Sequence, residues 1–268
     1  MTTCWNGIAT LALGLSVLSV AAVGASMGSG KDPIFIGVRA CGACHQGPES
    51  GHQFSKWRLS AHAKAYASLA LPESREIVRL SGITEEPQKA RMCLGCHAVA
   101  GDAEDWEKAE GFHIEDGLQC EACHGAGSEY APEDIMRDRE KAMMHGLKMP
   151  QKDDCMICHR AKGSHDAVLT KKPFDLDAAW QAIAHPTTKA EASTNQPAPG
   201  VSAGPFKHTG VMACARCHSG PMMGFQFSKW RMSNHAQAYA SLATPKALEL
   251  AREAGLKGEP QPADQCLK

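Results

Sequence analysis

Five copies of one short motif constrain this chain more than any other feature of its sequence. Each copy reads Cys-x-x-Cys-His, and together they use ten of the twelve cysteines. The copies are Cys41-Gly-Ala-Cys44-His45, Cys93-Leu-Gly-Cys96-His97, Cys120-Glu-Ala-Cys123-His124, Cys155-Met-Ile-Cys158-His159 and Cys214-Ala-Arg-Cys217-His218. Cysteines at this spacing lie on one side of a helical turn, where both can form thioethers with the vinyl groups of a haem. The following histidine is then held under the iron as the proximal ligand.

Other uses of paired cysteines fit this motif less well. A single Cys-x-x-Cys pair is compatible with a redox dithiol or with half of a zinc site. Neither use explains a histidine directly after the second cysteine in every copy, and a disulfide framework does not require that spacing. We therefore expect haem c at all five sites.

The composition agrees with a chain that is organised around haems. Aromatic residues make up only 6% of the sequence, whereas there are 13 histidines. Because haems are large and apolar, several of them can replace much of a hydrophobic core. We expect a mostly α fold with short helices, long loops and little or no sheet. The formal net charge is -1, which gives no reason to expect a nucleic-acid partner.

The N-terminus predicts export from the cytoplasm. Residues 8–23 form an apolar run of 16 residues, which is typical of a signal peptide and short for a membrane span. No lysine or arginine precedes the run, unlike in most signal peptides. We expect residues 1–30 to be a cleaved signal peptide of a periplasmic protein. The alternative is a retained anchor, which would bring the protein into contact with the membrane.

A long segment of the sequence occurs twice. The stretch "FSKWRLSAHAKAYASLA", which begins at Phe54, recurs from Phe227 with three differences, at an offset of 173 residues. A period of this length predicts a duplicated domain rather than a solenoid. We expect a four-haem domain over residues 31–189, a flexible linker over 190–205, and a second domain over 206–268 with one complete haem site. Cys266 is equivalent to Cys93 and is interpreted as the start of a sixth site that is cut off; the alternative is a free thiol.

The repeated segment also offers distal haem ligands. It is rich in alanine and contains no glycine or proline, so it is expected to be helical. His62 lies within it, and His235 lies at the equivalent position of the second copy. Because a multihaem protein needs further axial nitrogens, we interpret both histidines as distal ligands.

Three stretches of the sequence resemble the tetrahaem cytochrome c-554 family. They are "KWRLSAHAKAYASL", "GLQCEACHGAGSEY" and "CMICHRAKGSHDAVLTKKPFDLDAAWQAIAHP". The resemblance covers residues 35–186 and restarts at Gly210. It implies a mostly helical fold with closely packed haem pairs, in which three haems have two histidine ligands and the second haem along the chain has one.

The resemblance also implies which histidines serve which haem. By position, His62 reaches the third haem, that of His124, and His185 caps the haem of His159. The haem of His97 is left with an open face. The distal ligand of the first haem stays unassigned, because this sequence has Tyr130 where many relatives have a histidine. The alternatives for it are His113 and His145, followed by Met136, Met143 and Met144, and His165 is an alternative to His185 at the fourth haem.

These features favour a periplasmic electron carrier over an enzyme. Several haems in one chain form a relay, and irons with two histidine ligands leave no position for a substrate. Such a carrier needs a redox protein as donor and another as acceptor, for example a membrane quinone oxidoreductase or a second multihaem cytochrome. The alternative is an oxidoreductase that acts on nitric oxide, nitrite or hydroxylamine at the open face of the His97 haem. A third hypothesis is a structural conduit within a longer chain of haems.

Overall fold

The computed structural model describes residues 32–170, 173–185 and 209–267. The apolar N-terminal run and the expected linker lie outside these residues, so the expected domain boundaries remain predictions. None of the helices in the described part of the chain is long and apolar enough to cross a membrane.

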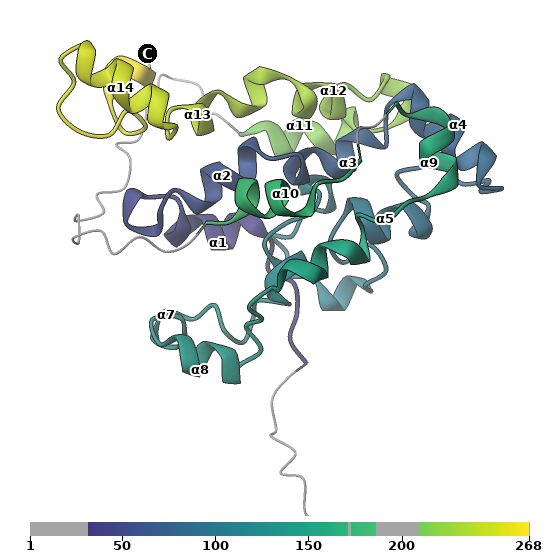
Figure 1. The fold of residues 1–268 in the computed structure, drawn as a ribbon, viewed down its shortest axis with the longest axis horizontal. Helices are drawn as coiled ribbons and strands as arrows, with labels where there is room; N and C mark the ends of the chain where they lie inside the picture. Colours follow the sequence, from purple (N-terminus) through teal and green to yellow (C-terminus); the bar gives the residue numbers. More distant parts are fainter. Residues whose placement is uncertain (1–31, 171–172, 186–208, 268) are drawn as a thin grey trace, which may run out of the picture. The chain divides into compact units, whose positions relative to one another are not determined.

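The first repeat is a succession of short α-helices and 3-10 helices (Figure 1). They are α1 (Val38–His45), η1 (Pro48–Ser50), α2 (Gln53–Leu59), η2 (His62–Lys64), α3 (Ala65–Ser68), α4 (Pro72–Leu80), α5 (Arg91–His97), η3 (Asp105–Glu107), η4 (Ile114–Asp116), α6 (Glu121–His124), α7 (Glu133–Met136), α8 (Arg139–Met144), η5 (Lys152–Ile157), α9 (Gly163–Val168) and α10 (Leu176–Ile183).

The second repeat follows the same order of elements from its first motif onward. Its elements are α11 (Val211–His218), η6 (Pro221–Met223), α12 (Gln226–Met232), η7 (Asn234–Gln237), α13 (Ala238–Ser241), α14 (Pro245–Glu253) and α15 (Asp264–Leu267). Among the described residues no strand forms, and the one β-bridge joins Phe35 to Lys108. The expectation of a mostly α fold with short helices is therefore confirmed.

The repeated segment is a broken helix rather than the continuous one that its composition predicted. Helix α2 ends at Leu59, and Ser60 is extended, with ψ at 164°. The Ser60 hydroxyl donates a hydrogen bond of 2.7 Å to the carbonyl oxygen of Trp57, and Ser233 makes the same bond to Trp230 in the second copy. A serine that bonds to a nearby carbonyl offers the backbone an alternative to the helix, which explains why the chain turns here in both copies.

The two repeats pack against each other through reciprocal contacts. Helix α12 packs on α3, and its counterpart α2 packs on α13, the counterpart of α3 (Figure 1). The Gln88 side chain donates to the Ser228 hydroxyl at 3.1 Å, and the equivalent Gln261 donates to the equivalent Ser55 at 3.0 Å. The interface therefore uses the same surface of both copies, as in a two-fold symmetric dimer.

The apolar core of the first repeat is divided into small clusters. One joins Val38, Trp57 and Ala63, and the side chain of Cys120 packs on its edge. The other joins Leu69, Leu94 and Ala98, with Cys93 on its edge. Motif cysteines thus border both clusters, which agrees with a fold that completes its core with haem.

Candidate haem-binding sites

Short helices place the cysteines and the histidine of each motif on one turn. The motif histidine is the last residue of α1, α5, α6 and α11, and His159 follows η5 by two residues. The eleven described cysteines are all free thiols. This is the state from which thioether bonds to haem are made, so the motifs have the backbone and the chemistry that haem c requires.

The four motifs of the first repeat lie next to one another in a definite order. A hydrogen bond between the thiols of Cys41 and Cys120 lowers the pKa of Cys41 and raises that of Cys120, so the first motif adjoins the third. Burial and the neighbouring Cys96 raise the pKa of Cys158 to about 11, so the second motif adjoins the fourth.

The third motif also adjoins the fourth. Burial, and after it the negative charge of Cys155, raises the pKa of Cys123. The motifs of the first repeat therefore follow one another in space in the order first, third, fourth, second.

The Nδ1 atoms of five candidate ligands are held by oxygen acceptors. A ring that donates its Nδ1 proton to an oxygen keeps the lone pair on Nε2, which is the tautomer and orientation needed to bind a metal. The contacts are His45 to Gln53 Oε1 at 2.5 Å, His97 to the Ala65 carbonyl at 2.9 Å, His124 to the Lys148 carbonyl at 2.9 Å, His185 to the Ile183 carbonyl at 2.7 Å, and His218 to Gln226 Oε1.

Three motif histidines face a second histidine ring. The ring centroids are 6.0 Å apart for His62 and His159, 6.1 Å for His124 and His185, and 6.4 Å for His97 and His165. Metal–imidazole bonds of about 2 Å on both sides of one metal put two opposed rings about 6 Å apart. The three pairs therefore fit an iron between them, with the remaining ligands supplied by the porphyrin.

The facing pairs differ from the pairs that the family resemblance implied. His62 faces the fourth motif rather than the third, and His185 faces the third rather than the fourth. The second motif, for which an open face was implied, has His165 opposite it. His62 turns towards the fourth motif because the break after α2 starts a new 3-10 helix at this residue.

The other candidate ligands lie apart from the facing pairs. His113 is half-buried at the start of η4, where its carbonyl accepts a hydrogen bond from Gln119, and His145 is exposed at the end of α8. His235 is exposed in η7. The ligand roles of these three residues remain predictions.

Tyr130 occupies a buried position next to the first and third motifs. It is 4% exposed, and its hydroxyl donates to the Gly125 carbonyl at 2.8 Å. Burial, followed by the charges of Cys41 and Glu121, raises its pKa. Cys266 lies in α15, exposed beside an open hollow of about 760 Å³.

Sequence reasoning missed the side chains that support the motifs. The Glu121 carboxylate, inside the third motif, accepts 2.8 Å hydrogen bonds from the backbone amides of Ile36, Gly37 and Gly127, and so fixes the segment before α1 to the third motif. Gln53 and Gln226 were also missed. They are identical at the offset of the repeat, and that signal would have found them.

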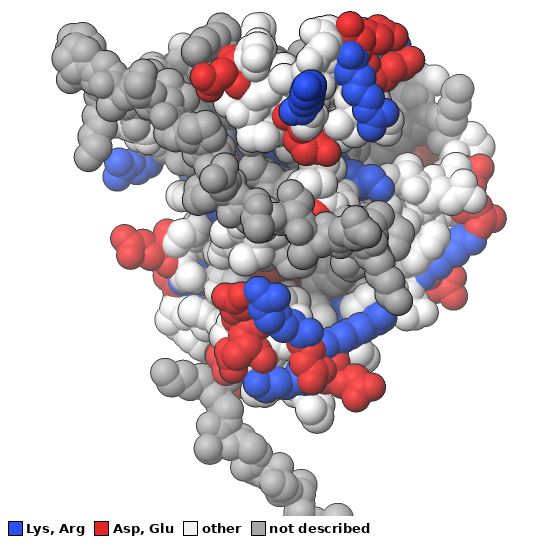
Figure 2. All heavy atoms as spheres, turned by 90° about the vertical axis from the view of Figure 1, so that its left-hand side faces the viewer, with Lys and Arg blue, Asp and Glu red and all other residues white. Residues whose placement is uncertain are grey.

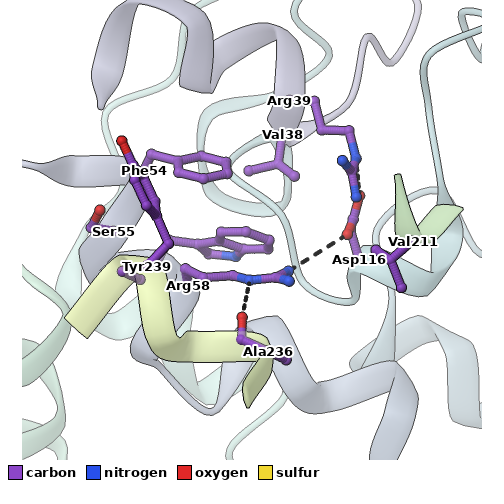
Figure 3. Close-up of a pocket in the computed structure, with 11 residues that line it drawn as sticks. Val38, Arg39, Phe54, Ser55, Arg58, Asp116, Val211, Ala236 and Tyr239 are labelled. Carbon is purple, nitrogen blue, oxygen red and sulfur yellow. Dashed lines mark hydrogen bonds and ion pairs between the residues drawn. The ribbon is translucent and has the colours of Figure 1, made fainter. Parts of the chain in front are cut away.

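The interface between the repeats contains a pocket of about 230 Å³ (Figure 3). The aromatic rings of Phe54, Trp57 and Tyr239 line one part of it, and Arg58 and Asp116 line another. The Arg58 side chain donates to the Ala236 carbonyl at 3.2 Å. The pocket is thus bounded by both copies and lies beside α1, which carries the first motif.

The surface has no dominant charge on the face shown in Figure 2, where acidic and basic side chains alternate. Elsewhere in the described part of the chain, exposed charges pair with near neighbours in sequence, such as Arg79 with Glu76 and Lys246 with Glu249. This distribution agrees with the net charge of -1.

Comparison with known proteins adds one family. The model described as "Cytochrome c554 and c-prime" matches residues 40–125 and 213–268, more than half of the chain. The two matched segments begin at equivalent positions of the repeat, and they include every motif except the one that ends at His159. No match was found among curated proteins or among solved structures.

Proposed function

The chain belongs to the cytochrome c554 and c-prime family, and on this premise we propose that it is a periplasmic multihaem electron carrier. It binds haem c covalently at five motifs and passes electrons from one redox protein to another. Its partners are a membrane quinone oxidoreductase or another multihaem cytochrome. Bound haem supplies the one-electron chemistry, whereas the chain sets burial, spacing and axial ligands.

The observation that carries this proposal is the pairing of histidine rings. Three motif histidines face a second imidazole, and the distance between the ring centroids fits one metal ion bonded to both rings. Two imidazoles fill both axial positions of a haem iron, which suits electron transfer because no position is left for a substrate. Two histidine ligands also give a lower reduction potential than a histidine and a methionine do.

The order of the motifs supports a relay. Cys41 neighbours Cys120 and Cys96 neighbours Cys158, so the motifs lie in two pairs, and Cys123 beside Cys155 brings the pairs together. Electrons are then expected to travel between the ends of this row, which are the first and second motifs. The first motif also lies near the interface with the second repeat, since Val38 of α1 lines the pocket there together with Tyr239.

The test uses the full chain produced with a c-type haem maturation system. The reduced pyridine adduct should report five haems c per chain, and the ferric protein should show mainly low-spin signals in electron paramagnetic resonance. Rapid and complete re-oxidation by a small cytochrome acceptor would support the carrier. A haem count of zero or one would overturn the proposal. Turnover of nitric oxide or hydroxylamine would support the enzyme instead.

A further inference from the structure

We propose that His165 is the second axial ligand of the haem held by Cys93, Cys96 and His97. This inference rests on the proposed function, because it requires haem at the second motif. It departs from the open face that the family resemblance implied for this haem. The consequence is that the second motif carries electrons and binds no small nitrogen compound.

The first reason is the geometry of the two rings. The His97 and His165 rings are 6.4 Å apart with 30° between their planes. This separation matches the two other facing pairs, at 6.0 and 6.1 Å. It is much longer than the direct stacking of His159 on Phe174, at 4.2 Å and 9°. The gap between His97 and His165 therefore has the width of a metal ion with one bond to each ring.

The second reason is that contacts at Nδ1, the ring nitrogen that does not bind iron, fix the orientation of His97. Its Nδ1 atom lies 2.9 Å from the Ala65 carbonyl oxygen and 3.2 Å from the Ser68 hydroxyl. A carbonyl oxygen only accepts, so Nδ1 carries the proton and Nε2 carries the lone pair. The ring is thus fixed in the tautomer that binds iron.

The third reason is that His165 is held by packing. It lies in α9, which packs on α4, where Ile77 and Val78 are each 7% exposed. Its amide donates to the Lys162 carbonyl at 2.9 Å, and its carbonyl accepts from the Leu169 amide at 2.8 Å. The position of His165 is therefore set by the contact between two helices.

The same segment covers the second motif at two further points. The Lys162 ammonium lies 3.8 Å from the Cys96 sulfur, and the thiol of Cys158 interacts with Cys96 as well. Residues 158–165 consequently lie alongside the second motif, with contacts that reach from Cys96 to His97. Because this segment lies over the second motif and the His165 ring is opposite His97, His165 is the side chain placed to bind the distal side of the haem.

The decisive variant is His165→Ala in the full haem-loaded chain. We expect one haem to change from low-spin to high-spin in electron paramagnetic resonance, and the reduced protein to bind one more carbon monoxide per chain. The matched control is Asp166→Ala, at an exposed position next to His165 in the same helix α9, and it should change neither readout. Unchanged spin state and carbon monoxide binding in His165→Ala would overturn the proposal.

A second variant covers the case in which the alanine protein does not fold. His165→Met keeps an axial ligand but exchanges nitrogen for sulfur, so one haem should stay low-spin and its reduction potential should rise. A titration that shows the same set of potentials as the parent protein would overturn the assignment.

Two further results distinguish this proposal from an arrangement in which His62 and His165 serve one haem, and from a failure of the proposed function. If His62 and His165 serve different haems, as their rings indicate, the double alanine variant should bind two more carbon monoxide molecules than the parent. A gain of only one would place both histidines at one haem and overturn the inference. A wild-type chain without haem would overturn the proposed function itself, whereas five haems with an unaltered His165→Ala spectrum would overturn only the role of His165.

Discussion

Arg231 of the second repeat forms an ion pair with Asp116 of the first, with 2.9 Å between Nη1 and Oδ1, and both side chains are at most 2% exposed. The other terminal nitrogen of Arg231 donates to the Ala63 carbonyl at 2.9 Å. Its counterpart Arg58 donates to the Ala236 carbonyl, which is the equivalent contact in the opposite direction. Two arginines from equivalent positions thus converge on one carboxylate at the centre of the interface, because Arg58 lies 4.0 Å from the same oxygen of Asp116.

Replacing Arg231 should weaken the packing of the two repeats. Arg231→Met removes the closest cation of the buried Asp116 carboxylate, which keeps Arg39 at 3.3 Å and Arg58 at 4.0 Å. The loss should therefore be measurable but smaller than the ~3–5 kcal/mol typical of a buried charge left without any partner. Denaturant unfolding of the haem-loaded chain, followed by circular dichroism, measures this loss. The control is Arg252→Met on the exposed face of α14. A loss similar to that of the control would show that the ion pair is not formed.

The reciprocal glutamines should have equal effects. Gln88→Ala and Gln261→Ala each remove a hydrogen bond to a serine of the other repeat and one to a tyrosine carbonyl of their own repeat. Each bond of this kind contributes about 0.5–1.5 kcal/mol. Because the two glutamines make equivalent bonds at one symmetric interface, the two variants should lower the free energy of unfolding by similar amounts. The comparison is Gln265→Ala, at an exposed position of α15. A large effect of one variant alone would contradict the symmetric arrangement.

The sequence predicted the features that repeat or that occupy a short stretch of chain. The five motifs, the mostly α class and the tandem relation of the copies all depend on residues near one another or at a fixed offset. The break after Leu59 was not predicted, because the serine that causes it is also compatible with a helix. Gln53 was recognisable in principle, since the offset of the repeat finds its counterpart Gln226.

The pairing of histidines was beyond sequence reasoning. His62 and His159 come from distant parts of the chain, and so do His124 and His185. Which of them meet depends on the path of the loops between the motifs. The sequence around a distal histidine does not indicate which haem that histidine binds. Asp116 is a similar case, because its partner Arg231 lies in the other repeat.

The glutamines behind the proximal histidines should set reduction potentials. Gln226 Oε1 accepts from His218 Nδ1 as Gln53 does from His45. Such an acceptor makes the imidazole more basic and so favours ferric iron. Gln226→Leu should therefore raise the potential of one haem in a spectroelectrochemical titration, and Gln53→Leu should do the same for another. Gln265→Leu serves as the exposed control, and a fall or no change in potential would contradict the role.

Glu121 should give the protein a pH-dependent stability. Burial raises the pKa of this carboxyl above its ordinary value of 4.5, although three backbone amides donate to it and act in the opposite direction. An acid with a raised folded pKa holds its proton longer in the folded chain than in the unfolded one. Its contribution to stability is therefore complete below about pH 4.5 and is lost as the pH rises through the folded pKa.

The variant Glu121→Gln removes this titration and replaces one carboxylate oxygen by an NH2 group. If that group takes the place of Oε2, it faces the Gly37 amide, which donates to this oxygen in the parent protein. We expect a loss of about 1–3 kcal/mol in the free energy of unfolding, since a buried donor then lacks an acceptor. The difference from the parent should be larger at pH 4.5 than at pH 7. Denaturant unfolding at both pH values measures it, with Glu140→Gln in the exposed first turn of α8 as the control. A difference that grows as the pH rises would mean that the carboxyl pKa is lowered in the fold, and would contradict the account of its burial.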